Sequence, residues 1–87
     1  MKKAFETPYA VAKLIAETPC REGVLSSDVR AANPEHPESG RKRMREMAIR
    51  FRDLTGQVPY SYDHNRFFPT GPFKKYCRQE MKRYELN

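Results

Sequence analysis

Positively charged side chains supply the most distinctive chemistry in this sequence. They gather in the segment Ser39–Gly56 (SGRKRMREMAIRFRDLTG) and again toward the C-terminus. Arginine donates paired hydrogen bonds to guanine or to phosphate oxygens, and lysine presents a mobile point charge to an anion. The sequence therefore predicts an anion-binding surface made from Arg41, Lys42, Arg43, Arg45, Arg50, Arg52, Arg66, Lys74, Lys75 and Arg78.

The charge of the whole chain agrees with that prediction. The 87 residues include 17 Lys and Arg against 11 Asp and Glu, a formal net charge of +6 at pH 7. Such a balance favours nucleic acid, an acidic protein surface or anionic lipid as partner. No run is apolar enough to span a membrane, and the opening MKKAFETP lacks the apolar core of a signal peptide. We expect a single cytoplasmic domain, residues 1–87, with a small core and no membrane partner.

The remaining reactive side chains form no recognisable catalytic motif. His36 lies in the sequence PEHP and His64 follows Asp63, with no nucleophile motif or glycine-rich phosphate loop beside either histidine. Cys20 and Cys77 are far apart, whereas structural zinc ligands usually come in closely spaced pairs. We expect free thiols, no enzymatic activity, no cofactor and no metal, the alternatives being a disulfide or a zinc site that also uses the histidines.

The basic segment is itself predicted to be an amphipathic helix. Ser39 offers an N-cap oxygen and Gly56 can adopt the left-handed conformation beyond the last turn. At about 100° per residue, the apolar residues make one face and the arginines flank it on both sides. The face comprises Met44, Met47, Ala48, Phe51 and Leu54; Arg41, Arg45 and Arg52 lie on one flank, Arg43 and Arg50 on the other, and Lys42, Glu46, Ile49 and Asp53 point outward.

That helix has two interpretations. Basic residues near a helix N-terminus oppose the helix dipole at about 0.3 to 1 kcal/mol each, which a docked anion would relieve. Alternatively, the cations form a solvated face in which Glu46 pairs with Lys42 and Arg50, four residues away on either side. The first interpretation predicts a binding surface and the second predicts none.

Shorter elements are expected before the basic helix. Thr7 and Pro8 predict a helix start after a short N-terminal arm, and Pro19 ends that helix. Val24-Leu25 predicts a stub of strand, the cap cluster Ser26–Asp28 starts a short helix through Ala32, and residues 34–37 (PEHP) form a rigid connector.

A hairpin and a last helix follow the basic segment. Val58, Tyr60 and Tyr62 alternate with Pro59 and Ser61, as in a strand, and Pro59 implies that this strand has a free edge. Asp63-His64-Asn65 predicts a turn and Arg66-Phe67-Phe68 a second strand. The final helix is expected from Phe73 to about Tyr84, with Tyr76 and Tyr84 suited to the core or to a homodimer contact through this helix.

The order of helix, strand stub, short helix, basic helix and hairpin resembles that of the winged helix-turn-helix family. The resemblance covers residues 7–69, with residues 70–87 as a basic C-terminal helix, and it implies a mainly α fold of three helices plus a wing. It also implies that the Ser39–Gly56 helix enters the major groove of DNA while Tyr60–Phe68 forms the wing. The connector at residues 33–38 is longer than the tight turn of the simplest helix-turn-helix motifs.

These observations predict a small basic DNA-binding protein. Its size and charge are typical of a transcriptional regulator or an accessory factor of a phage or mobile element, with duplex DNA as partner. The alternative is an inhibitor or adaptor that docks its basic helices on an acidic surface of a larger nucleic-acid-processing host enzyme, and RNA binding comes third. The hairpin aromatics Tyr60, Tyr62, Phe67 and Phe68 are expected to pack on the helices rather than to stack on unpaired bases.

Overall fold

The computed structural model describes residues 2–86, with side chains described for residues 7–85. These residues form four helices and three strands: α1 (Lys2–Glu17), β1 (Val24–Leu25), α2 (Ser26–Ala31), α3 (Pro37–Thr55), β2 (Tyr60–Asp63), β3 (Arg66–Pro69) and α4 (Gly71–Leu86). As expected, the fold is mainly helical with a small antiparallel sheet. Its element order is compatible with a winged-helix topology.

The sheet is built around the β2–β3 hairpin. The strand order is β1-β3-β2, with Val24 opposite Phe67 and Tyr62 opposite the same phenylalanine on the other side. His64 and Asn65 make the two-residue turn with φ angles of 49° and 65°, the left-handed values that such hairpin turns require. The predicted hairpin is therefore confirmed. Because β2 is an edge strand, the free edge inferred from Pro59 is confirmed as well.

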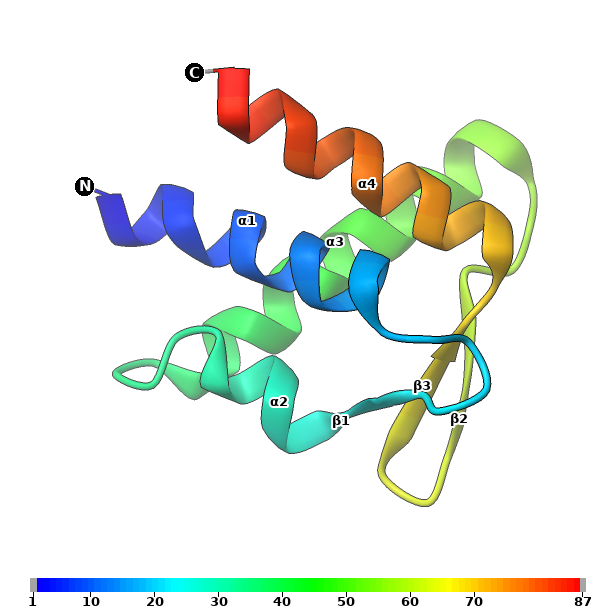
Figure 1. Cartoon of the computed structure of the whole chain (residues 1–87), viewed down its shortest axis with the longest axis horizontal. Helices are drawn as coiled ribbons and strands as arrows, with labels where there is room; N and C mark the ends of the chain where they lie inside the picture. The colour runs from blue at the N-terminus through cyan, green and yellow to red at the C-terminus, as the bar shows by residue number, and fades with distance from the viewer. Residues whose placement is uncertain (1, 87) are drawn as a thin grey trace.

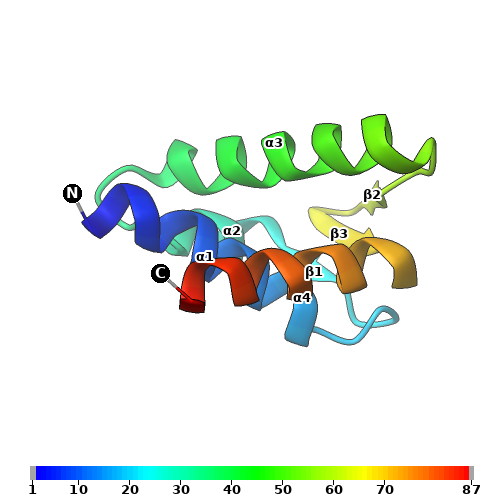
Figure 2. The same ribbon diagram turned by 90° about the horizontal axis from the view of Figure 1, so that it is seen from above.

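The core lies between α3 and a pair of helices formed by α1 and α4. Figures 1 and 2 show α1 and α4 running side by side, with α3 in a separate layer. Phe51 from α3 packs edge-on against Phe73 from α4, their ring centroids 5.3 Å apart. Ile15 from α1 and Val29 from α2 are also fully enclosed. The C-terminal helix thus contributes to the same core as the segments before it.

The N-terminal arm was predicted wrongly. Helix α1 begins at Lys2 and carries Pro8 in its interior, where we expected the helix to begin. Proline costs a helix one hydrogen bond and some steric strain, so it is a strong start signal but not an absolute one. Packing of α1 along α4 supplies the stabilisation that local propensity does not measure.

Three predicted boundaries also shift. Helix α3 starts at Pro37, with His36 at its N-cap position, so Ser39 lies inside the helix and is not its cap. Proline is well suited to the first turn because its missing N–H has no helical partner there. Helix α2 starts at Ser26 without a side-chain cap, and α4 runs from Gly71 to Leu86, two residues beyond the predicted helix at each end.

Two apolar residues differ from what their spacing predicted, Leu54 in its burial and Val58 in its place in a strand. Leu54 continues the apolar face of α3 in sequence, yet it is 75% exposed because it lies in the last turn, beyond the enclosed part of that face. Val58 lies before β2 begins and is 65% exposed. The centre of the face behaves as predicted, since Met44, Met47, Ala48 and Phe51 are buried, and Gly56 ends α3 with φ 71°.

Candidate nucleic-acid interface

The arginines of α3 are divided into two flanks with different surroundings. On the flank toward α4, Arg43 donates to Glu46 Oε1 at 2.6 Å. Arg50 donates to the Tyr76 hydroxyl at 3.4 Å and lies 3.6 Å from Glu80 Oε1. The hydrogen bond with Tyr76 raises the pKa of Arg50, with smaller contributions from nearby negative charge. These two cations, which we call the α4 flank, already have intramolecular partners.

Glu80 explains why Arg50, on the α4 flank, is paired within the chain. Its side chain is only 6% exposed, and its second carboxylate oxygen accepts from Arg83 at 2.9 Å. A buried carboxylate requires compensation by cations or donors, and here Arg50 from α3 and Arg83 from α4 provide it. Arg50 is thereby committed to the contact between the two helices.

The opposite flank of α3 faces the hairpin and carries Arg41, Arg45 and Arg52, which we call the hairpin flank. Among the residues whose side chains are described, those of Arg45 and Arg52 make no ion pair or hydrogen bond, and Arg41 lies 4.0 Å from Glu38. The positive charges of Arg45 and Arg52 are therefore available to an external partner. The solvated-face interpretation of the basic helix paired Glu46 with Lys42 and Arg50. Neither pair forms among the described side chains, and Glu46 pairs with Arg43 instead.

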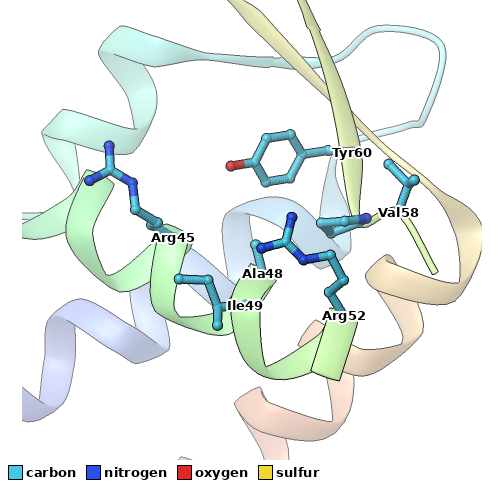
Figure 3. Close-up of a pocket in the computed structure, with 7 residues that line it drawn as sticks. Arg45, Ala48, Ile49, Arg52, Val58 and Tyr60 are labelled. Atoms are coloured by element: carbon cyan, nitrogen blue, oxygen red, sulfur yellow. The ribbon is translucent and has the colours of Figure 1, made fainter. Parts of the chain in front are cut away.

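A hollow of about 310 Å³ lies between α3 and the start of the hairpin. Figure 3 shows Arg45 and Arg52 projecting from α3 at this hollow, with the ring of Tyr60 over the helix between them. Apolar side chains make most of its surface. We call it the apolar hollow, and its lining residues are Arg45, Ala48, Ile49, Arg52, Val58, Pro59 and Tyr60.

A second hollow, of about 400 Å³, lies where α2, α3 and the hairpin turn converge. It is more polar, and both Arg30 and Arg41 line it. The backbone N–H of Ser26 donates to the carbonyl of Asn65 at 3.0 Å and so ties the hairpin turn to α2. This polar hollow is lined by Leu25, Ser26, Ser27, Arg30, Arg41, Tyr62 and Asn65.

Arg30 is a functional candidate that sequence analysis missed. It lies in a six-residue helix with no other cation, so no local pattern distinguishes it. Only the packing of α2 against α3 brings it to the same hollow as Arg41. The sequence offered one signal for it, because Arg30 is a basic residue in the helix that precedes the predicted recognition helix.

The other predicted cations are not all brought to this face. Lys42 is exposed on α3 and Lys75 on α4, while Lys74 is half-buried. Arg66 donates to the Glu22 carbonyl at 3.1 Å, and Arg78 donates to the Ala16 carbonyl at 3.1 Å. The last two arginines therefore serve contacts within the chain, Arg78 between α4 and α1.

The hairpin aromatics pack mainly on the protein itself. Phe67 is buried, and its ring centroid lies 5.2 Å from that of Tyr60 and 4.8 Å from that of Tyr62. Tyr60 also approaches Phe73 at 6.0 Å. Tyr62 is 55% exposed and donates its hydroxyl proton to Asn65 Oδ1 at 3.0 Å. Core packing is therefore confirmed for Phe67 and Tyr60, and only Tyr62 presents much ring surface to solvent.

Other reactive groups lie apart from the two hollows. Cys20 is exposed, and Cys77 is buried in the core, where desolvation raises the pKa of its thiol to about 12. Among the side chains that the structure describes, those of residues 7–85, no three from His, Cys, Asp or Glu come together as a metal ion would require. None of the helices in the described part of the chain is long and apolar enough to cross a membrane.

No family model matches the sequence, and neither curated proteins nor solved structures gave a significant match. The contacts, burial and charges described above therefore carry the functional inference.

Proposed function

We propose that this protein binds duplex DNA through the hairpin flank of α3, with the β2–β3 hairpin alongside as a wing. The observation that carries the proposal is the pair of arginines, Arg45 and Arg52, that lack partners within residues 7–85 and border a hollow next to the hairpin. A net charge of +6 would add a general attraction to the phosphate backbone.

The dimensions of α3 suit a DNA groove. The helix has 19 residues, and the major groove is about 12 Å wide, enough to admit an α-helix with its side chains. In this arrangement Arg41, Lys42 and Arg45 meet base edges or phosphates, because they occupy the first half of the helix on its exposed side. Arg30 in the polar hollow would contact the adjacent backbone.

We also propose that the fold is that of a winged helix-turn-helix domain. The helices α2 and α3 are followed by a hairpin whose second strand, β3, pairs with β1, and this is the arrangement with which a winged helix-turn-helix domain reads DNA. A protein of this size and charge would act as a transcriptional regulator, or as an accessory factor of a phage or mobile element.

A fluorescence-anisotropy titration with random duplex DNA at two salt concentrations tests the proposal. The decisive variant is Arg45→Ala/Arg52→Ala, which removes both unpartnered charges from exposed positions. We expect wild-type affinity to fall steeply with salt, and the double variant to bind at least tenfold more weakly with a shallower salt dependence, because fewer counterions are released.

Two controls separate the site from charge alone. Lys13→Ala/Lys82→Ala removes the same net charge from exposed positions on α1 and α4, and Arg43→Ala removes an arginine from the α4 flank. Both should bind DNA nearly as the wild type does. Equal weakening by Lys13→Ala/Lys82→Ala would refute the assigned face, and no measurable duplex binding by the wild type would refute the function.

Exposed apolar side chains favour one alternative, docking on an acidic surface of a larger nucleic-acid-processing enzyme. Ile49, Leu54 and Val58 lie in α3 or just after it and are all exposed. Arginine combined with apolar residues is common in the centres of protein interfaces. Feeble duplex binding, together with a host protein that stays bound at high salt, would support this alternative.

A further inference from the structure

The apolar surface between Arg45 and Arg52 distinguishes this part of α3 from a simple phosphate-binding site. Ile49 is 42% exposed and lies on the outer side of α3 between the two arginines in sequence. Ala48 and Val58 extend the apolar surface into the hollow (Figure 3), and Pro59 also lines it. A ligand that fits here has an apolar group between two hydrogen-bond acceptors or negative charges.

Duplex DNA offers that combination in its major groove. A phosphate pressed against Ile49 would lose water and gain no donor there, which is unfavourable. Guanine presents the O6 and N7 acceptors that arginine binds, and thymine presents an apolar 5-methyl group. A thymine methyl therefore matches Ile49, and guanine edges match the guanidinium groups on either side.

The spacing along the helix agrees with base-pair geometry. Arg45 and Arg52 are seven residues apart, which at 1.5 Å per residue is about 10 Å along the axis. Base pairs stack at about 3.4 Å, so the two arginines would span about three base-pair steps. Ile49 follows Arg45 by four residues, about 6 Å, and would meet a base pair between the two.

We propose that Ile49 contacts the 5-methyl group of a thymine that lies between two base pairs whose guanines are bound by Arg45 and Arg52. This inference rests on the proposed function and adds a sequence preference to it. A second copy of the chain is a poor occupant of the same hollow, because it would bring another pair of arginines against the first. The preferred duplex therefore carries a thymine flanked, within about three steps, by guanines.

The test starts from duplexes selected from a random library by the wild-type protein. Each thymine in the selected site is replaced in turn by deoxyuridine, which removes only the 5-methyl group. We expect one replacement to weaken wild-type binding about three- to tenfold, the effect of losing one buried methyl group. The remaining replacements should change the affinity less than twofold.

Protein variants identify the residue that contacts this methyl group. Ile49→Ala should bind the selected duplex more weakly and no longer distinguish thymine from deoxyuridine, and Ile49→Val should retain part of the discrimination. Leu54→Ala is the matched control, because it removes an even more exposed apolar side chain from the same helix and should leave the discrimination intact. Circular dichroism verifies that all variants are folded.

The outcomes separate this inference from the proposed function. If the wild type binds the selected duplex but no deoxyuridine replacement matters, or if Ile49→Ala keeps the discrimination, the inference is wrong and DNA binding stands. Selected sites that lack a thymine between guanines overturn it as well. If the wild type selects no duplex at all, both fall, and an acidic protein surface becomes the better occupant of the hollow.

Discussion

Gly40 is where substitution by a single methyl group should change this protein most clearly. It lies in the first half of α3 and is buried against α2. A methyl group added at Gly40 would overlap the backbone carbonyl oxygen of Val29 and lie 3.0 Å from its carbonyl carbon. Because these are backbone atoms, no side-chain rotation can relieve the overlap, and α2 and α3 would have to move apart.

Two opposing effects determine the stability of Gly40→Ala. Alanine is the better helix former, which alone would stabilise α3 by about 1 kcal/mol. Overpacking of a well-packed contact typically costs about 1 to 3 kcal/mol, and backbone overlap belongs at the upper end. We therefore expect a net loss of about 1 to 2 kcal/mol in the free energy of unfolding, or about 5 to 15 °C in Tm for a domain of this size.

Thermal and urea unfolding, followed by circular dichroism at 222 nm, would measure this loss. Gly71→Ala is the matched control, because Gly71 is the first residue of α4 and a methyl group there meets no atom within 4 Å. It should be neutral or slightly stabilising. A Gly40→Ala protein as stable as the wild type would refute the close approach of α2 to α3.

Three further predictions concern the thiols and the hairpin turn. In the native protein at pH 8, a thiol reagent should modify Cys20 quickly and Cys77 only upon unfolding. The reason is that Cys77 is buried and the pKa of its thiol is raised to about 12. Fast modification of both thiols would contradict this burial. The unfolded thiol ionises near its ordinary pKa of 9.0, so unfolding is favoured as pH rises from 9 toward 12. Cys77→Ala should therefore lose less stability across that window than the wild type. At the turn, His64→Val should lower the free energy of unfolding by about 1 kcal/mol or more, because a β-branched residue disfavours the φ of 49°. His64→Gly should not lower it. Equal Tm values for the two variants would show that the turn relaxes.

Features that depend on a few neighbouring residues were predictable. The two-residue turn at His64 and Asn65, the edge strand after Pro59 and the left-handed residue Gly56 all follow from local backbone preferences. The buried centre of α3 follows from the 3.6-residue period, because an amphipathic helix in a small domain has one way to hide its apolar stripe. In these places the local preference and the final packing agree.

Features that depend on what packs against a segment were not predictable. Helix α1 continues through Pro8 because it lies along α4, and Leu54 is exposed because it lies beyond the enclosed part of the α3 face. The spacing of the arginines placed Arg50 and Arg52 on opposite flanks of α3, but only the tertiary contacts show that Glu80 and Tyr76 neutralise one of them. The sequence alone determined that a basic amphipathic helix and a hairpin exist. The tertiary structure decided which of Arg50 and Arg52 remains available, because the partners of Arg50 lie on α4, which is distant along the chain.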